Sequence, residues 1–158
     1  MEKCENGSQT ASVHINESIQ TAQPYKVQYT AKTNTTGGRD GMSKSSDGHF
    51  NIKRSTPGII GTGTNPEQLF AAGWSAYFEG AMGFEGRKMK VKLPEDLAIH
   101  AEVDLCNDDG VYSLQARLNV NLPGLDYDVA HALVDTASQT CPYSKSIPGN
   151  IPVEFNLV

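Results

Sequence analysis

Hydrophobic and polar residues alternate in several short segments, which is the pattern of β-strands with one buried and one solvated face. The two clearest segments, residues 99–105 and 112–120, flank the turn sequence NDDG at residues 107–110 and together predict a β-hairpin. The same alternation predicts a strand at residues 25–32 and a last strand at residues 151–157. Weaker signals predict strands at residues 49–53 and 89–93.

Two other segments carry helix signals. Asn65 and Pro66 form a strong helix start, because asparagine is a favoured N-cap and proline suits the first helical position. Apolar residues then recur at three- and four-residue spacing as far as Ala81, with small residues at many positions between them. We expect this helix to be buried on most of its circumference, because small side chains allow close packing. Asp126 can cap a second helix that ends near Cys141.

The order of these elements is strands, helix, strands, helix and strand. It predicts an α+β fold in which mainly antiparallel sheets cover two helices. Residues 1–23 contain few apolar side chains and are expected to form a flexible N-terminal tail. A length of 158 residues suits one domain, which we expect to span residues 24–158.

Charge and hydropathy exclude several classes of partner. The net charge of −5 arises from 13 basic and 18 acidic residues scattered along the chain, so nucleic acid is a poor candidate partner. No apolar run approaches the roughly 20 residues of a transmembrane helix, and the N-terminus lacks the pattern of a secretory signal or transit peptide. We therefore expect an intracellular, cytoplasmic protein without membrane insertion.

General motifs for cofactor, metal and nucleophile chemistry are absent. The glycine-rich segments at 37–41 and 61–63 match neither a phosphate-binding loop nor a dinucleotide fingerprint, and no GxSxG motif occurs. The histidines show no ligand spacing, and the cysteines Cys4, Cys106 and Cys141 are too far apart for a zinc site or disulfide framework. We expect neither a cofactor nor a metal ion.

Three motifs resemble one known family. The segments NPEQLFAAG at residues 65–73, TGGRDG at residues 36–41 and CPYS at residues 141–144 resemble the organic hydroperoxide resistance (Ohr) branch of the OsmC/Ohr family. The resemblance spans about residues 25–158, and the motifs occur in the family's order. It implies an intertwined homodimer in which antiparallel sheets wrap two central helices, with two active sites at the subunit interface.

The same resemblance implies an activity. The family's enzymes are thiol peroxidases that reduce organic hydroperoxides and are recycled by lipoylated proteins. A peroxidatic cysteine on the first central helix attacks the peroxide, an arginine and a glutamate activate that cysteine, and a second cysteine resolves the intermediate. Carried over to this sequence, Arg39 and Glu67 match the activating pair, and Cys141 matches the resolving cysteine.

This chain departs from the family at the peroxidatic position, where it has Tyr77. A phenol cannot attack a peroxide oxygen to form a sulfenate, so the two-cysteine cycle cannot run and a lipoylated reductant is not expected. Cys4 and Cys106 offer no replacement, because one lies in the tail and the other in the hairpin. Cys141 acting alone would lose the geometry in which arginine activates the first cysteine.

Three hypotheses follow for a pocket that holds Arg39, Glu67 and Tyr77 and is lined by the aromatic residues Trp74, Phe78 and Tyr143. The favoured hypothesis is non-redox acid/base chemistry, meaning isomerisation, cyclisation or elimination, on a hydrophobic oxygenated small molecule. The second is a catalytically inactive, ligand-binding descendant. In the third, the exchange was introduced into a peroxidase or leaves a residual one-cysteine activity through Cys141 on organic hydroperoxides.

Overall fold

The computed structural model describes residues 26–58 and 61–158. The chain divides into two compact units, Met1–Lys32 and Thr33–Val158, and the tail expected at residues 1–23 lies outside the described residues. The strand expected at residues 25–32 is wrong, because residues 26–32 form no secondary structure. Val27 and Tyr29 are 74% and 77% exposed, so the alternation that predicted a strand buries no apolar face there.

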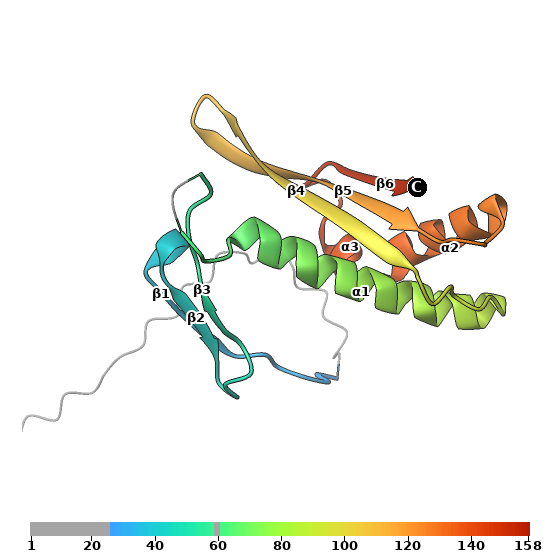
Figure 1. Cartoon of the computed structure of the whole chain (residues 1–158), viewed down its shortest axis with the longest axis horizontal. Coiled ribbons are helices and arrows are strands. Elements are labelled where there is room, and N and C mark those ends of the chain that lie inside the picture. Colours follow the sequence, from blue (N-terminus) through green and yellow to red (C-terminus); the bar gives the residue numbers. More distant parts are fainter. Residues whose placement is uncertain (1–25, 59–60) are drawn as a thin grey trace, which may run out of the picture. The chain divides into compact units, whose positions relative to one another are not determined.

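The second unit is an α+β fold built on two three-stranded sheets (Figure 1). The first sheet has the order β1-β2-β3 and the second has the order β4-β5-β6. All pairs are antiparallel except β5 with β6, so the expectation of mainly antiparallel sheets is confirmed. The elements are β1 (Thr33–Thr36), a 3₁₀ turn η1 (Gly38–Asp40), β2 (Met42–Ser45), β3 (Asn51–Lys53), α1 (Pro66–Met89), β4 (Ala98–Asp108), β5 (Val111–Asn121), α2 (Tyr127–Thr140), α3 (Pro142–Ser146) and β6 (Val153–Leu157).

The β4–β5 hairpin is confirmed and is longer than its sequence pattern indicates. Its register runs from Ala98 opposite Asn121 to Asp108 opposite Val111. Asp109 and Gly110 form the turn with φ angles of 47° and 86°, the left-handed geometry that matches the twist of a two-residue hairpin.

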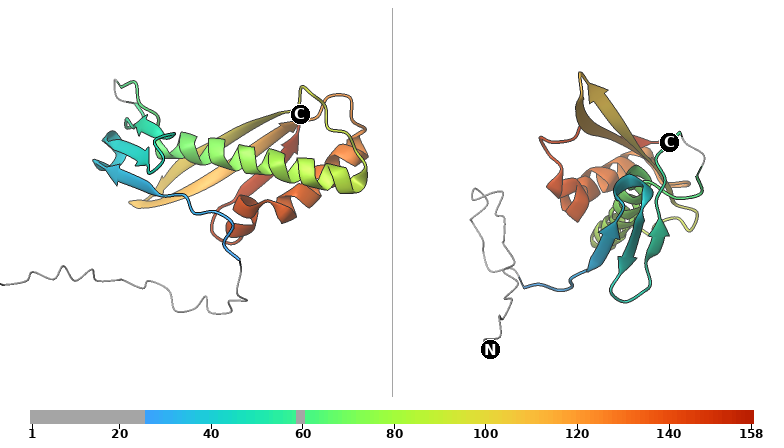
Figure 2. Two further views of the ribbon diagram at one scale, coloured as in Figure 1. Left: turned by 90° about the horizontal axis from the view of Figure 1, so that it is seen from below. Right: turned by 90° about the vertical axis from the view of Figure 1, so that its left-hand side faces the viewer.

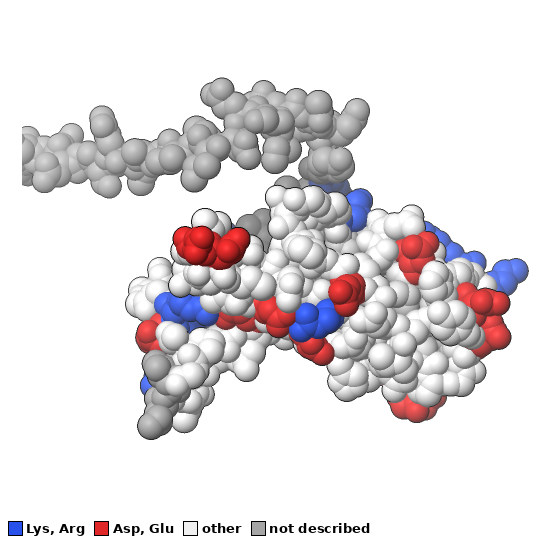
Figure 3. Space-filling model, turned by 90° about the horizontal axis from the view of Figure 1, so that it is seen from above, with Lys and Arg blue, Asp and Glu red and all other residues white. Residues whose placement is uncertain are grey.

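Acidic and basic side chains lie beside one another on the surface seen in Figure 3, so no uniformly basic surface appears on this face.

Helix α1 begins where the sequence predicts it and runs eight residues past Ala81. The Asn65 side chain accepts a hydrogen bond from the backbone N–H of Gln68 at 2.8 Å, which caps the first turn. The helix ends at Lys90 in a left-handed conformation, with the N–H of Val91 bonded to the carbonyl of Gly86. The strand expected at residues 89–93 is therefore wrong, because this apolar stretch closes the helix end instead.

The core lies between the β4–β6 sheet and the helices α1 and α2, which pack on the same side of it (Figures 1 and 2). Helix α1 contributes Trp74, Phe78 and Met82, which are fully buried. The expectation that most sides of α1 are buried is wrong for one chain, because Tyr77 and Phe84 are 52% and 51% exposed. The opposite face of the helix is left without a covering layer in the described part of one chain.

The short first sheet is held together by a buried arginine. Arg54, only 4% exposed, donates from Nε to the carbonyl of Gly38 at 2.8 Å and from Nη2 to that of Thr36 at 2.9 Å. Its Nη1 donates to the hydroxyl of Ser43. The turn also requires Gly41, since a Cβ there would lie 1.7 Å from the Thr36 oxygen. These contacts fix the turn that carries residue 39.

Replacing Arg54 with methionine is expected to lower the free energy of unfolding by about 2–4 kcal/mol, because two carbonyls and a hydroxyl lose a charged donor. Arg54→Lys is expected to lose less, since an ammonium keeps the charge but cannot span the same acceptors. Urea unfolding followed by circular dichroism measures both. The exposed neighbour Lys53 provides the control Lys53→Met, and equal stability of Arg54→Met and this control would contradict the assignment.

Candidate functional site

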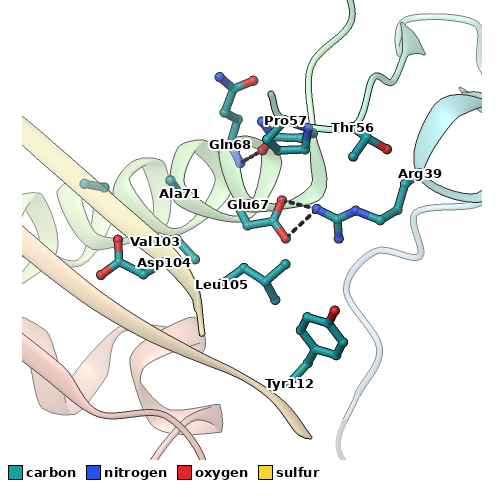
Figure 4. A pocket seen from close by; sticks show the side chains of 12 residues that line it. Arg39, Thr56, Pro57, Glu67, Gln68, Ala71, Val103, Asp104, Leu105 and Tyr112 are labelled. Carbon is teal, nitrogen blue, oxygen red and sulfur yellow. Dashed lines mark hydrogen bonds and ion pairs between the residues drawn. The ribbon is translucent and has the colours of Figure 1, made fainter. Parts of the chain in front are cut away.

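The centre of the candidate site is an ion pair between residues 28 positions apart in the sequence. Arg39 lies in η1, and Glu67 lies in the first turn of α1. The Nη2 atom of Arg39 contacts both carboxylate oxygens of Glu67, at 2.9 and 2.8 Å (Figure 4). A carboxylate in the first helical turn is also stabilised by the helix dipole. The structure thus brings together the two residues that the sequence motifs placed in one site.

The ion pair borders an open cleft of about 980 Å³. One wall comes from α1, where Ala71 lies one turn after Glu67, and the opposite wall comes from the β4–β5 hairpin (Figure 4). Most of this lining is apolar; its polar groups lie around Arg39 and at the helix start, with Asp104 and Tyr112 on the hairpin side. The lining residues are Arg39, Thr56, Pro57, Asn65, Glu67, Gln68, Ala71, Ala101, Val103, Asp104, Leu105 and Tyr112.

Asp40 anchors the turn on the other side of Arg39. Its carboxylate accepts hydrogen bonds from the backbone N–H of Thr56 at 2.8 Å and from the Thr56 hydroxyl at 3.1 Å. These two bonds hold the pKa of Asp40 below its usual value. The carboxylate is therefore ionised at neutral pH and ties η1 to the loop that borders the cleft.

Asp104 lies at the hairpin side of the cleft, but its carboxylate is hydrogen-bonded to side chains of β5. Arg117 donates to its two oxygens at 2.8 and 3.2 Å, and Gln115 donates to one of them at 2.8 Å. The bonds from Arg117 and Gln115, in that order, lower the pKa of Asp104. The same contacts, first with Asp104 and then with Glu102, raise the pKa of Arg117. The cleft therefore has a second ionised carboxylate at its border.

Tyr77 does not line this cleft. It follows Glu67 by ten residues on α1, which corresponds to about 15 Å along the helix axis. Its ring packs against that of Tyr143 with a centroid separation of 5.0 Å, and it lines a separate cavity of about 350 Å³. One chain therefore places Arg39 and Glu67 together but leaves Tyr77 outside their cleft.

The three aromatic residues expected to line the pocket lie elsewhere in the fold. Trp74 and Phe78 are fully buried in the core, where the Trp74 Nε1 donates to the Ser144 hydroxyl at 3.0 Å. Tyr143 is half-buried and lies over Gly73, at which a Cβ would approach its hydroxyl to 3.3 Å. None of the three borders the Arg39 cleft: Trp74 and Phe78 are buried in the core from α1, and Tyr143 lies on α3.

Cys141 connects α2 to α3 and is fully buried, with its N–H bonded to the carbonyl of Ala137 at 2.8 Å. Cys106 is half-buried on β4 opposite Ser113, and Cys4 lies outside the described residues.

Among residues 26–58 and 61–158, no group of three metal-ligating side chains comes together. Over the same residues, no helix is long and apolar enough to cross a membrane.

Sequence reasoning missed the hairpin side of the cleft. Val103, Leu105 and Tyr112 line it, although the sequence pattern assigned them only to strands. The signal was present in the alternation, because Ala101, Val103 and Leu105 share one face of β4. What the pattern could not show is that this face extends beyond the core and meets the first turn of α1.

Comparisons with known proteins agree with the sequence motifs. The family model described as OsmC-like protein matches residues 60–156. An organic hydroperoxide resistance protein of Xanthomonas axonopodis pv. citri is 44% identical over 140 residues, which cover 86% of this chain and 99% of the relative. Organic hydroperoxide resistance protein OhrB of Bacillus subtilis is 40% identical over 134 residues, covering 82% and 97%.

Solved structures give the same result. The crystal structure of OhrB of Bacillus subtilis has a TM-score of 0.79 at 38% identity and covers 84% of this chain and 100% of that one. A putative organic hydroperoxide resistance protein of Vibrio cholerae, with captopril bound in one of its active sites, has a TM-score of 0.78 at 32% identity, covering 85% and 95%. Fold, motifs and relatives together show that this chain belongs to the OsmC-like protein family, alongside the organic hydroperoxide resistance proteins.

Proposed function

We propose that this protein binds a hydrophobic, oxygenated small molecule in the Arg39–Glu67 cleft and acts on it by proton transfer instead of reducing a peroxide. The observation that carries the proposal is the ion pair itself, which borders an apolar cleft while none of the residues lining that cleft has a thiol. The reaction class is isomerisation, cyclisation or elimination, in which no electrons are exchanged with an external reductant.

The cleft supports binding of a molecule that is apolar along its body and polar at one end. Ala71, Val103 and Leu105 offer apolar contact surface, and burying apolar area there is favourable at roughly 25 cal/mol per Å². Arg39 supplies the polar end, because its Nε and Nη1 make no hydrogen bond with the described residues and remain available to an oxygen acceptor.

The cysteines favour a route other than peroxide reduction. Reduction of a hydroperoxide by a thiol needs a sulfur atom that the peroxide oxygen can reach. Cys141 is fully buried in the core, and Cys106 pairs with Ser113 near the turn of the β4–β5 hairpin and does not line the cleft. The one-cysteine hypothesis through Cys141 would require this buried thiol to become accessible to the peroxide before each turnover.

The acid/base group of the proposal is Tyr77 of a second copy. Tyr77 lies too far along α1 to reach the cleft of its own chain, and it is 52% exposed. Phe84, at 51% exposure, and the exposed small residues Ala76 and Gly80 lie on the neighbouring surface of α1. We propose that this α1 face pairs with the same face of a second copy, so that each Tyr77 enters the partner's cleft.

Size-exclusion chromatography with light scattering tests the dimer. The native chain is expected at twice its 17.1 kDa mass, and Phe84→Arg is expected at the single-chain mass, because a charged guanidinium would replace an apolar ring in the paired surface. Tyr127→Arg is the matched control, since Tyr127 is 68% exposed on α2. A native monomer, or a Phe84→Arg variant that remains dimeric, would contradict the pairing.

Exchange of the α-hydrogens of 2-octanone in D₂O, followed by proton NMR, tests proton transfer. The native protein is expected to accelerate exchange, and Tyr77→Phe is expected to lower that acceleration by about a hundredfold, the usual contribution of a positioned acid or base. Arg39→Ala is expected to abolish it, and Tyr127→Phe to leave it unchanged. If Tyr77→Phe matched the native rate, Tyr77 would have no acid/base role. A native protein no faster than buffer would leave the inactive ligand-binding hypothesis in its place.

A further inference from the structure

A second hydrogen-bond donor enters the Arg39–Glu67 cleft from the hairpin. Tyr112 is the second residue of β5 and lines the same cavity as the ion pair. Figure 4 shows its hydroxyl end pointing toward the ion pair, with Leu105 beside it on the same wall. The hydroxyl makes no hydrogen bond with the described residues, and the side chain is 69% exposed. This phenol therefore faces the cleft with its donor free.

Arg39 lines the same cleft and has hydrogen-bond donors that Glu67 does not use. Only its Nη2 is used by Glu67, which leaves the Nε and Nη1 protons of the guanidinium fork unengaged by described residues. The two donors come from separate elements, η1 and β5, and each is positioned by its own sheet. An oxygen atom placed between them could accept from both, because a carbonyl oxygen has two lone pairs.

The charges around the cleft favour a neutral ligand oxygen over a ligand carboxylate. Glu67 already neutralises Arg39, and Asp40 and Asp104 are both held ionised by their hydrogen-bond donors. A ligand carboxylate would therefore approach Arg39 beside the Glu67 carboxylate without an unpaired cation to balance it, which is costly in a partly desolvated site. A neutral carbonyl oxygen meets no such repulsion.

We infer that Arg39 and Tyr112 form a two-donor site for one uncharged carbonyl oxygen, of a ketone or an ester, whose apolar body lies along Ala71, Val103 and Leu105. The inference rests on the proposed function, since it names the substrate class of the same cleft. It assigns the phenol of Tyr112 a direct contact with the ligand and makes the site selective for neutral carbonyl compounds over carboxylates of the same length.

Isothermal titration calorimetry at pH 7.5 tests the inference with two probes of equal chain length, 2-octanone and octanoate. The native protein is expected to bind 2-octanone at least tenfold more tightly than octanoate. Tyr112→Phe keeps the aromatic ring and removes only the hydroxyl, so it is expected to weaken 2-octanone binding about tenfold, the effect of one lost hydrogen bond. Tyr127→Phe is the control and is expected to bind like the native protein.

The variants and probes distinguish failure of the Tyr112 inference from failure of the proposed function. If Arg39→Ala weakens binding of 2-octanone and Tyr112→Phe does not, the cleft is the binding site and the role of Tyr112 is overturned. Octanoate binding as tight as that of 2-octanone would overturn the selectivity for neutral oxygen. If the native protein binds neither probe, or if Arg39→Ala binds like the native protein, the proposed function itself fails.

Discussion

The Arg39–Glu67 ion pair joins the short β1–β3 sheet to the helix that carries the core, and both of its residues line the cleft. Other contacts fix the segment that carries each of the two residues. The Asn65 cap and Pro66 fix the first turn of α1, while Arg54 and Asp40 fix the turn that carries Arg39. The pair is therefore preorganised, and its remaining guanidinium donors face the cleft without having to be ordered by a ligand.

The same preorganisation separates two kinds of chemistry. In a thiol peroxidase, the arginine and glutamate assist a sulfur atom that supplies electrons to the peroxide. Here neither of the described thiols lines the cleft, since Cys141 is in the core and Cys106 is not among the hairpin residues that border it, and position 77 has a phenol. The groups near the ion pair can donate hydrogen bonds to an oxygen atom of a ligand and can transfer protons. The proposed function therefore keeps ligand binding at this site and replaces thiol redox chemistry with proton transfer.

Much of the fold could be predicted from the sequence, because its strongest signals are local. The β4–β5 hairpin, the capped start of α1 and helix α2 follow from alternation and capping residues that act over a few positions. The strand expected at residues 25–32 failed because alternation indicates a buried face only where another layer covers it. The strand expected at residues 89–93 failed because helix closure at Lys90 uses the same apolar residues.

The candidate site was only partly predictable. Arg39 and Glu67 could be paired because both lie in motifs that resemble one family, but the motifs did not show that Tyr77 lies outside the cleft of its own chain. Tyr112 and Leu105 could not be assigned to the cleft from their strand pattern, because only the packing of the hairpin on α1 brings them there. Long-range packing therefore decided the residues that sequence patterns missed.

The most direct test of the central claim, that this fold keeps the binding site but lacks its electron donor, is consumption of cumene hydroperoxide with dihydrolipoamide as reductant. We expect the native protein and Cys141→Ser to be inactive and Tyr77→Cys to gain peroxidase activity that depends on Arg39. Rapid peroxide consumption by the native protein that is lost in Cys141→Ser would contradict the account and show that peroxide reduction proceeds through a single cysteine.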